Sequence, residues 1–359
     1  MASADKVETG RFKLGYRPAL DGLRGLAVLA VLTAHSGLLK SGAASVGVDV
    51  FFVLSGFLIT SLLIGEWDGL RRISLKDFYA RRALRLLPAL VVFLVVVTAG
   101  FWFIAPGETA LANAGDALVA LLYSTNWARA FGLRRPDLLG HTWTLSIEEQ
   151  FYLLWPLLLI WLLRRTGSRR SMCYWLLLAI ALVYVERVLL DAAGANLMRL
   201  SFGTDTRADS LLLGCLVGVL LSSNLATTGE RRFVRWSAWA AALALVILTF
   251  YTGPFPVELQ FFDSVVSVAA AILIFAMAKS KDCALNRGLA HSWLVYIGKI
   301  SYGLYLWHHP IFRVVQSWEW PWQRTLVVEV VTTVLVTLAS FYLPERPFLR
   351  LKKRFSPIS

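Results

Sequence analysis

The feature that most constrains this 359-residue chain is a series of long apolar runs that recur from residue 20 to residue 343. Several runs have about 16–22 residues, the length that an α-helix needs to cross the hydrocarbon core of a bilayer. Only 16% of the residues are charged, whereas soluble domains contain about a quarter. The first run is too long for a signal-peptide core and lacks a convincing cleavage site. We therefore predict an all-α fold, a polytopic helix bundle in a membrane.

The apolar runs predict ten transmembrane helices. These are expected at residues 20–39, 46–65, 86–105, 145–163, 172–190, 208–223, 236–252, 263–279, 293–316 and 325–343. Residues 110–127 also have a helical pattern but are only moderately apolar. We interpret them as an amphipathic helix on the outer surface, because an additional span there would place the basic turn at 164–170 outside.

The distribution of basic residues predicts the orientation of the chain. With a cytoplasmic N-terminus, 25 of the 36 Lys and Arg residues lie in inner segments, 7 in outer segments and 4 within spans. Basic residues in short loops mark the cytoplasmic side, so both termini are expected there. We expect one domain over residues 1–359, with cytoplasmic tails at 1–19 and 344–359. Basic inner loops beside anionic lipids explain most of the net charge of +13, and no nucleic-acid partner is needed.

The cysteines and histidines do not indicate a metal site. The chain has three cysteines and five histidines, and neither set has the spacing of metal ligands. The sequence contains no nucleotide-binding glycine motif and no HExxH motif. We predict no metal and no tightly bound cofactor, and we expect the cysteines to serve in packing.

Two ionisable residues of the first span, Arg24 and His35, lie on one helix face. Eleven steps of 100° amount to about three turns plus roughly 20°, with a rise of about 16 Å. Ionisable groups in a membrane helix usually face a polar cavity, so the pair predicts a wet path through the interior. The alternative is that Arg24 extends to the interface and His35 is a packing residue.

The other polar residues of the expected spans sort into two layers. The inner layer has three arginines just before the third span, namely Arg81, Arg82 and Arg85. The outer layer takes its imidazoles and carboxylates from five spans: His35, Asp49, Glu148, Asp209 and His308. Carboxylates beside an imidazole in an apolar pocket tune a general base, and arginine clusters hold phosphates. The layers therefore predict a catalytic base outside and an anion site inside.

Each layer also has an interpretation without catalysis. The positive-inside rule alone explains basic residues before the third span, and Glu148 and Asp209 lie within a turn of their helix ends. His308 is alternatively explained as a partner for the backbone carbonyl that Pro310 leaves free. His309 points about 100° away from His308 and is the weaker candidate.

Seven stretches of the sequence resemble, in order, the motifs of the bacterial membrane-bound acyltransferase-3 family. They are RPALDGLRGLAVLAVLTAH (17–35), GVDVFFVLSGFLIT (47–60), FYARRALRLLP (78–88), HTWTLSIEEQFYLLWP (141–156), TDTRADSLLLG (204–214), SYGLYLWHHPI (301–311) and ERPF (345–348). The first contains R-x10-H, from Arg24 to His35, and the third contains R-x-x-R, from Arg82 to Arg85. Together the stretches extend over nearly the whole chain.

This resemblance implies an enzyme of the bacterial cytoplasmic membrane, an O-acyltransferase that moves an acetyl or other short acyl group from acyl-CoA to a hydroxyl. Family acceptors are usually sugars and include surface polysaccharides, lipopolysaccharide O-antigen, peptidoglycan and macrolides. The resemblance implies that His35 is the catalytic base and that Arg24, Arg82 and Arg85 bind the donor. Because the sequence ends at Ser359 with only a basic tail, we expect the form without an extracytoplasmic domain.

These expectations combine into one mechanistic hypothesis. The phosphates of acyl-CoA bind the inner arginines, Arg81 included, and the pantetheine arm passes Arg24 towards His35. His35 deprotonates the acceptor hydroxyl, and we expect Glu148, or as second choice Asp49, to orient it. Four further residues of the resembling stretches are expected to bind substrate: Arg207, Asp209, His308 and Tyr152.

Two alternatives stay open at this point. The first is an acyl intermediate on His35 or Ser55, although Ser55 lacks the context of a nucleophile elbow and is expected to pack helices together with Gly56. The second is a transporter or flippase for a lipid-linked sugar, which also needs ionisable groups in a polar cavity. The sequence lacks the repeat symmetry of many transporters. An acyltransferase is expected to bind CoA at the inner arginines, whereas a transporter need not.

Overall fold

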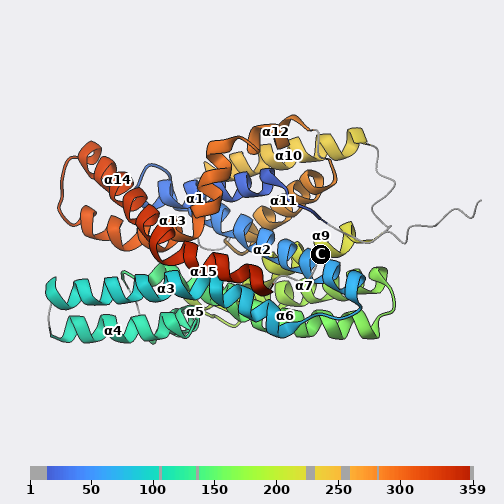
Figure 1. The fold of residues 1–359 in the computed structure, drawn as a ribbon, viewed down its shortest axis with the longest axis horizontal. Coiled ribbons are helices and arrows are strands. Elements are labelled where there is room, and N and C mark those ends of the chain that lie inside the picture. Colours follow the sequence, from blue (N-terminus) through green and yellow to red (C-terminus); the bar gives the residue numbers. More distant parts are fainter. Residues whose placement is uncertain are drawn as a thin grey trace, which may run out of the picture.

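The computed structural model describes residues 14–104, 107–134, 137–223, 231–251, 259–280 and 283–355. Within these ranges every regular element is a helix, and most long helices lie roughly along one common axis (Figure 1). The ten longest helices are α1 (Pro18–His35), α2 (Ser41–Leu70), α3 (Leu75–Ile104), α6 (Trp143–Arg165), α7 (Arg169–Ala192), α9 (Thr204–Leu221), α10 (Arg231–Thr249), α11 (Leu259–Lys279), α13 (Ser292–Gln316) and α14 (Trp322–Ser340).

Short helices connect or extend the long ones. They are α4 (Glu108–Leu121), α5 (Thr125–Ala130), η1 (Gly140–Thr142), α8 (Leu197–Phe202), α12 (Ala284–Leu289), η3 (Phe341–Glu345), α15 (Arg346–Leu351) and η4 (Lys352–Phe355). Local sequence explains several helix ends. Pro18 stands in the first turn of α1, where its missing N–H is not needed. The chain reverses between α6 and α7 at Gly167, which has a φ of +62°, and Ser168 then caps the N-terminus of α7.

The prediction of an all-α, multi-pass membrane protein is confirmed. Seven of the described helices are long and apolar enough to cross a membrane: α2, α3, α6, α7, α10, α11 and α14, the last with its C-terminal extension. The predicted spans also include α1, α9 and α13, which carry the polar residues of interest. The number of ten spans and the cytoplasmic termini stay predictions.

The helix directions agree with the predicted alternation of spans. Helices α1 and α13 are parallel, because Gly298 lies against the backbone of Asp21 and His308 lies beside His35. Helices α2 and α9 are also parallel, since Gly214 meets Val53 and Gly218 meets Thr60. If α4 were an additional span, both pairs would be antiparallel. The directions therefore support the interpretation that α4 does not cross. Its orientation differs from the expected helix on the outer surface, because α4 packs lengthwise along α3 (Figure 1).

Helix α2 lies at the centre of the bundle. Its most apolar window is 78% buried within the protein, whereas that of α7 is 17% buried. It packs against α1, α9 and α11, and its close contact with α9 depends on two glycines. An added Cβ on Gly56 would lie 2.0 Å from the Leu211 carbonyl oxygen, and one on Gly214 would lie 2.1 Å from that of Val53. Small residues at this crossing bring the two backbones into contact.

A buried network of ion pairs connects the four helices α2, α7, α9 and α11. Arg207 on α9 pairs with Asp49 on α2 at 2.5 Å and with Asp263 on α11. Arg187 on α7 pairs with Asp209 on α9, and all five side chains are at most 9% exposed. Charges in such surroundings require partners, so the network fixes the relative positions of the four helices.

We predict that Gly56→Ala destabilises the bundle by about 1–3 kcal/mol, because the added methyl group forces α2 and α9 apart. Gly100→Ala is the matched control, since nothing lies within 4 Å of its Cβ position on α3. Thermal unfolding of the purified proteins in detergent measures both. Equal unfolding temperatures for the two variants would contradict the close-contact role of Gly56.

We predict that Arg207→Met destabilises the protein by about 3–5 kcal/mol, because the substitution leaves Asp49 and Asp263 buried without their cation. The exposed Arg72→Met is the control for loss of a positive charge. The same thermal unfolding measurement applies. A stable Arg207→Met protein would show that the network is not what holds the four helices in place.

Candidate active site

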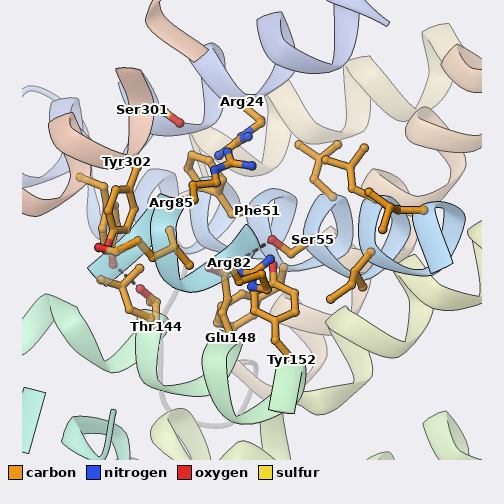
Figure 2. Close-up of a pocket in the computed structure, with 18 of the residues that line it drawn as sticks. Arg24, Phe51, Ser55, Arg82, Arg85, Thr144, Glu148, Tyr152, Ser301 and Tyr302 are labelled. Carbon is orange, nitrogen blue, oxygen red and sulfur yellow. Dashed lines mark hydrogen bonds between the residues drawn. The ribbon is translucent and has the colours of Figure 1, made fainter. Parts of the chain in front are cut away.

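A cavity of about 210 Å³ lies between α1, α2, α3, α6 and α13 (Figure 2). Four arginines line it, one from α1 and three from the first turns of α3: Arg24, Arg81, Arg82 and Arg85. The first turns of α3 precede Pro88, which lies near the start of the predicted third span at 86–105. We call this the inner cavity, because the predicted topology puts its arginines near the cytoplasmic side.

Two of the four arginines have acidic partners. Arg81 lies 3.5 Å from Glu66 and also donates to the carbonyl oxygen of Phe355, at 2.5 Å. Arg82 pairs with Glu149 at 2.8 Å, and its guanidinium lies 3.3 Å from the centre of the Tyr152 ring. Both side chains are therefore held in place before any ligand arrives.

The other two arginines face each other in the cavity. Figure 2 shows the guanidinium groups of Arg24 and Arg85 side by side, although they come from different helices. Neither group makes a hydrogen bond or an ion pair with another residue in the part of the chain that the structure describes. Two adjacent cations repel each other unless an anion binds them. The geometry therefore makes this pair a candidate site for a negatively charged group.

The predicted catalytic carboxylate Glu148 belongs to the inner cavity. Its Oε1 accepts a hydrogen bond of 2.6 Å from Ser55, and both side chains line the cavity wall (Figure 2). Ser55 therefore does more than pack helices, in contrast to the expectation from its sequence context. The sequence could not reveal this contact, because 93 residues separate the two partners.

One tyrosine connects the inner cavity with a group of histidines. Tyr305 lines the cavity, and its hydroxyl lies 2.7 Å from that of Thr144. The same hydroxyl donates to the carbonyl oxygen of His141 at 2.9 Å, and the ring lies 5.4 Å from that of His308. The far end of the inner cavity is thus one side chain away from the imidazoles.

Four of the five histidines form one cluster, which contains His35, His141, His308 and His309. His308 Nε2 lies 3.2 Å from His35 Nδ1. The ring of His309 lies 5.4 Å from that of His35 and stacks on His141 at 4.8 Å. His309 points away from His308 along α13, yet it also contacts His35, because the end of α1 lies against both side chains. Among the described residues no group of three or more possible ligands is arranged to hold a metal ion.

Proline in α13 organises part of this cluster. Pro310 has no N–H, so the carbonyl of Leu306 loses its helical partner. From the sequence we expected His308 to hydrogen-bond to this free carbonyl. In the structure the partner of the Leu306 carbonyl is His141 Nε2, at 3.1 Å. His308 Nδ1 instead lies 2.7 Å from the Tyr305 carbonyl oxygen and 3.1 Å from that of Leu304.

A second cavity, of about 420 Å³, opens on the other side of the histidine cluster, and we call it the outer cavity. His35 and His309 line it together with Arg129 and Gln316. Gln316 donates to the backbone carbonyl of His35 at 3.0 Å. Arg129 donates to the Gly140 carbonyl at 2.8 Å, and its guanidinium stacks over a phenylalanine ring. These side chains form a polar wall around the His35 imidazole.

The structure corrects the predicted partner of His35. Glu148 bonds to Ser55, and Asp49 is committed to Arg207, so neither carboxylate contacts the imidazole. Both had been expected beside His35 because they share its predicted depth. The predicted depths were too coarse: α2 does pack against α1, but Gly47 meets Ala27, about two turns before His35, and His35 instead contacts His308 of α13.

The structure places the four expected substrate-binding residues differently. Tyr152 lines the inner cavity, where the guanidinium of Arg82 lies over its ring. Arg207 and Asp209 belong to the buried ion-pair network and line neither the inner nor the outer cavity. His308 also lines neither cavity, and it is fully buried against His35. Of the four residues, Tyr152 is therefore the one whose position allows direct contact with a substrate in either cavity.

Sequence reasoning missed two residues of the site, Arg129 and His141, and ranked His309 below His308. His141 stands at the start of the stretch HTWTL, and a histidine just before a span is a weak signal by itself. Arg129 lies in α5, outside the expected spans, where a single arginine carries no signal. Only the folded chain brings them to His35.

Comparison with known proteins identifies the family of the chain. An acyltransferase domain model matches residues 17–344. The chain is 33% identical to the O-acetyltransferase OatA of Staphylococcus aureus over 356 residues, and 31% identical to the peptidoglycan O-acetyltransferase OatA of Listeria monocytogenes over 355 residues. It is 32% identical to YrhL of Bacillus subtilis over 349 residues. No solved structure matches the chain.

The matches extend over almost all of this chain but only part of each relative. They cover 92–94% of the chain and 55–57% of the relatives, so the chain spans little more than half their length. The domain match includes Arg24, His35 and the arginines of α3. On this match, the chain belongs to the acyltransferase-3 family of membrane proteins.

Proposed function

We propose that this protein is a membrane O-acyltransferase that takes an acetyl or other short acyl group from acyl-CoA and transfers it to a hydroxyl of a sugar-containing acceptor. The observation that carries the proposal is that two unpaired arginines, Arg24 and Arg85, line the inner cavity, while the His35 imidazole lines the outer cavity. Tyr305 lies between the two. The proposal places donor binding in the inner cavity and the acceptor in the outer cavity.

The donor side of the proposal depends on Arg24 and Arg85. Guanidinium groups bind phosphates in bidentate geometry, and CoA carries several phosphates. Arg82 and Arg81 add positive charge to the same wall. With the phosphates at this end, the uncharged pantetheine arm extends towards Tyr305. Helical rise gives about 16 Å between Arg24 and His35 along α1.

The acceptor side depends on His35. In the proposed reaction its imidazole takes the proton of the acceptor hydroxyl while the hydroxyl oxygen attacks the thioester carbonyl. The carbon–oxygen bond forms, the carbon–sulfur bond breaks, and the CoA thiolate recovers a proton from the imidazolium. The polar wall of the outer cavity, with Arg129 and Gln316, supports a hydroxylated acceptor.

The relatives narrow the proposed acceptor. The Listeria relative carries a name that states peptidoglycan O-acetylation. We propose a peptidoglycan-type saccharide, reached from the extracytoplasmic side of a bacterial cytoplasmic membrane. The positive-inside charge pattern supports this orientation.

Arg24→Met and Arg85→Met are each expected to weaken CoA binding about 10- to 100-fold, the loss expected for one charge-assisted hydrogen bond of about 1.5–3 kcal/mol. Titration of CoA into the purified protein in detergent measures the dissociation constant. Arg72→Met, an exposed arginine in the turn before α3, is the matched control and should bind as the wild type does. The affinity should also fall with salt.

Two results would count against the donor site. If wild-type protein binds no CoA, the transporter hypothesis gains, because a transporter needs no CoA site. If Arg85→Met and Arg72→Met bind CoA equally well, the inner cavity is not where the phosphates lie.

His35→Ala is expected to lower acetyl transfer about 10²- to 10⁴-fold, which is the usual contribution of a general base. CoA binding should be unchanged, because His35 lines the outer cavity and not the inner one. Release of CoA from acetyl-CoA, with a soluble peptidoglycan disaccharide as acceptor, measures the rate. Full activity of the variant would exclude His35 as the base.

A further inference from the structure

We infer that His308 is the positioning residue of the active site, which fixes the proton of His35 on Nδ1 and leaves Nε2 as the basic nitrogen. The inference rests on the proposed role of His35 as the general base. It gives the base a neutral histidine partner in place of the expected carboxylate.

The hydrogen bonds of His308 determine its tautomer. Its Nδ1 lies 2.7 Å from the Tyr305 carbonyl oxygen and 3.1 Å from that of Leu304. Carbonyl oxygens only accept hydrogen bonds, so this nitrogen carries the proton. His308 is 0% exposed, and the rings around it are those of Tyr305, Phe312 and three other histidines. Because an unpaired charge is costly there, His308 is neutral and its Nε2 is an acceptor.

The acceptor nitrogen of His308 then determines the tautomer of His35. The two atoms that face each other, His308 Nε2 and His35 Nδ1, are 3.2 Å apart. Since the first is an acceptor, the second must be the donor. A neutral His35 therefore has its lone pair on Nε2. The second ring nitrogen of a catalytic histidine is commonly held in this way, which selects the nitrogen that takes the substrate proton.

The other side chains around His35 do not perform this task, and the imidazole also has a backbone hydrogen bond to Val31, one turn back on α1. His309 Nδ1 lies 3.0 Å from the Leu138 carbonyl, and His141 Nε2 lies 3.1 Å from the Leu306 carbonyl, so backbone holds both rings. Gln316 bonds to the backbone of His35 and to Glu329. The titratable and charged side chains around His35 are His141, His308 and His309, with Arg129, Arg134, Asp137, Arg313 and Glu329 further along the outer cavity and α14.

Two amide substitutions at position 308 separate positioning from packing. Asn and Gln both carry one amide group, but the shorter Asn amide reaches the position of Nδ1, whereas the longer Gln amide reaches that of Nε2. His308→Asn therefore keeps a donor for the backbone carbonyls and loses the contact with His35. His308→Gln keeps an acceptor for His35. The expected result is a kcat at least tenfold lower in His308→Asn than in His308→Gln.

The pH profile of kcat adds a readout that packing alone would not move. In His308→Asn the acidic limb of the profile should shift, because the environment of the His35 imidazole changes. His308→Gln should keep the wild-type profile, and both variants should keep the wild-type affinity for CoA. The assay is CoA release from acetyl-CoA with the peptidoglycan disaccharide. His291→Leu, at the exposed other end of α13, is the control for loss of a histidine.

The outcomes distinguish this inference from the proposed function. If His35→Ala keeps full activity, the proposed function fails, and the role of His308 fails with it. If His35→Ala is inactive but the Asn and Gln variants share one kcat and one pH profile, only the positioning role is overturned. A tenfold or larger gap between Asn and Gln with equal CoA affinity supports it.

Discussion

The cost of placing a charge inside an apolar bundle governs the arrangement of this protein. A buried ion must have a partner or face a cavity, and two pairs of arginines illustrate the two cases. Arg187 and Arg207 have buried carboxylates as partners and bind four helices together. Arg24 and Arg85 have none and face the inner cavity. The same physical rule thus separates the structural cations from those available to a ligand.

Close helix packing links the inner cavity to the base. Glycines bring the backbones of α1 and α13 into contact, with Gly25 against Leu294 and Gly298 against Asp21. This contact fixes the register of two parallel helices over their whole length. Three turns further along, the same register places His308 beside His35. Small residues near one end of the pair therefore determine the geometry of the imidazoles at the other.

Much of the fold could be predicted from the sequence, because each span is a local pattern. Apolar runs located the ten long helices, and the spacing of Arg24 and His35 placed them on one face of α1. Helix neighbours could not be predicted in this way, because they depend on contacts between distant residues. Asp49 resembled a catalytic group in its apolar segment, yet its partner Arg207 lies 158 residues away. The same limitation concealed His141, whose contact with Leu306 spans 165 residues.

The division into two cavities fits the chemistry of the proposed donor. CoA carries its negative charge at one end and its reactive thioester at the other. If the phosphates stay at Arg24 and Arg85, no charged group has to enter the apolar middle of the bundle, where its transfer would cost several kcal/mol. Only the uncharged arm then needs to reach Tyr305. Beyond this tyrosine lies His308, which is fully buried and neutral. A neutral histidine can hold the proposed base His35 in place without a carboxylate, whose own charge would require a further partner.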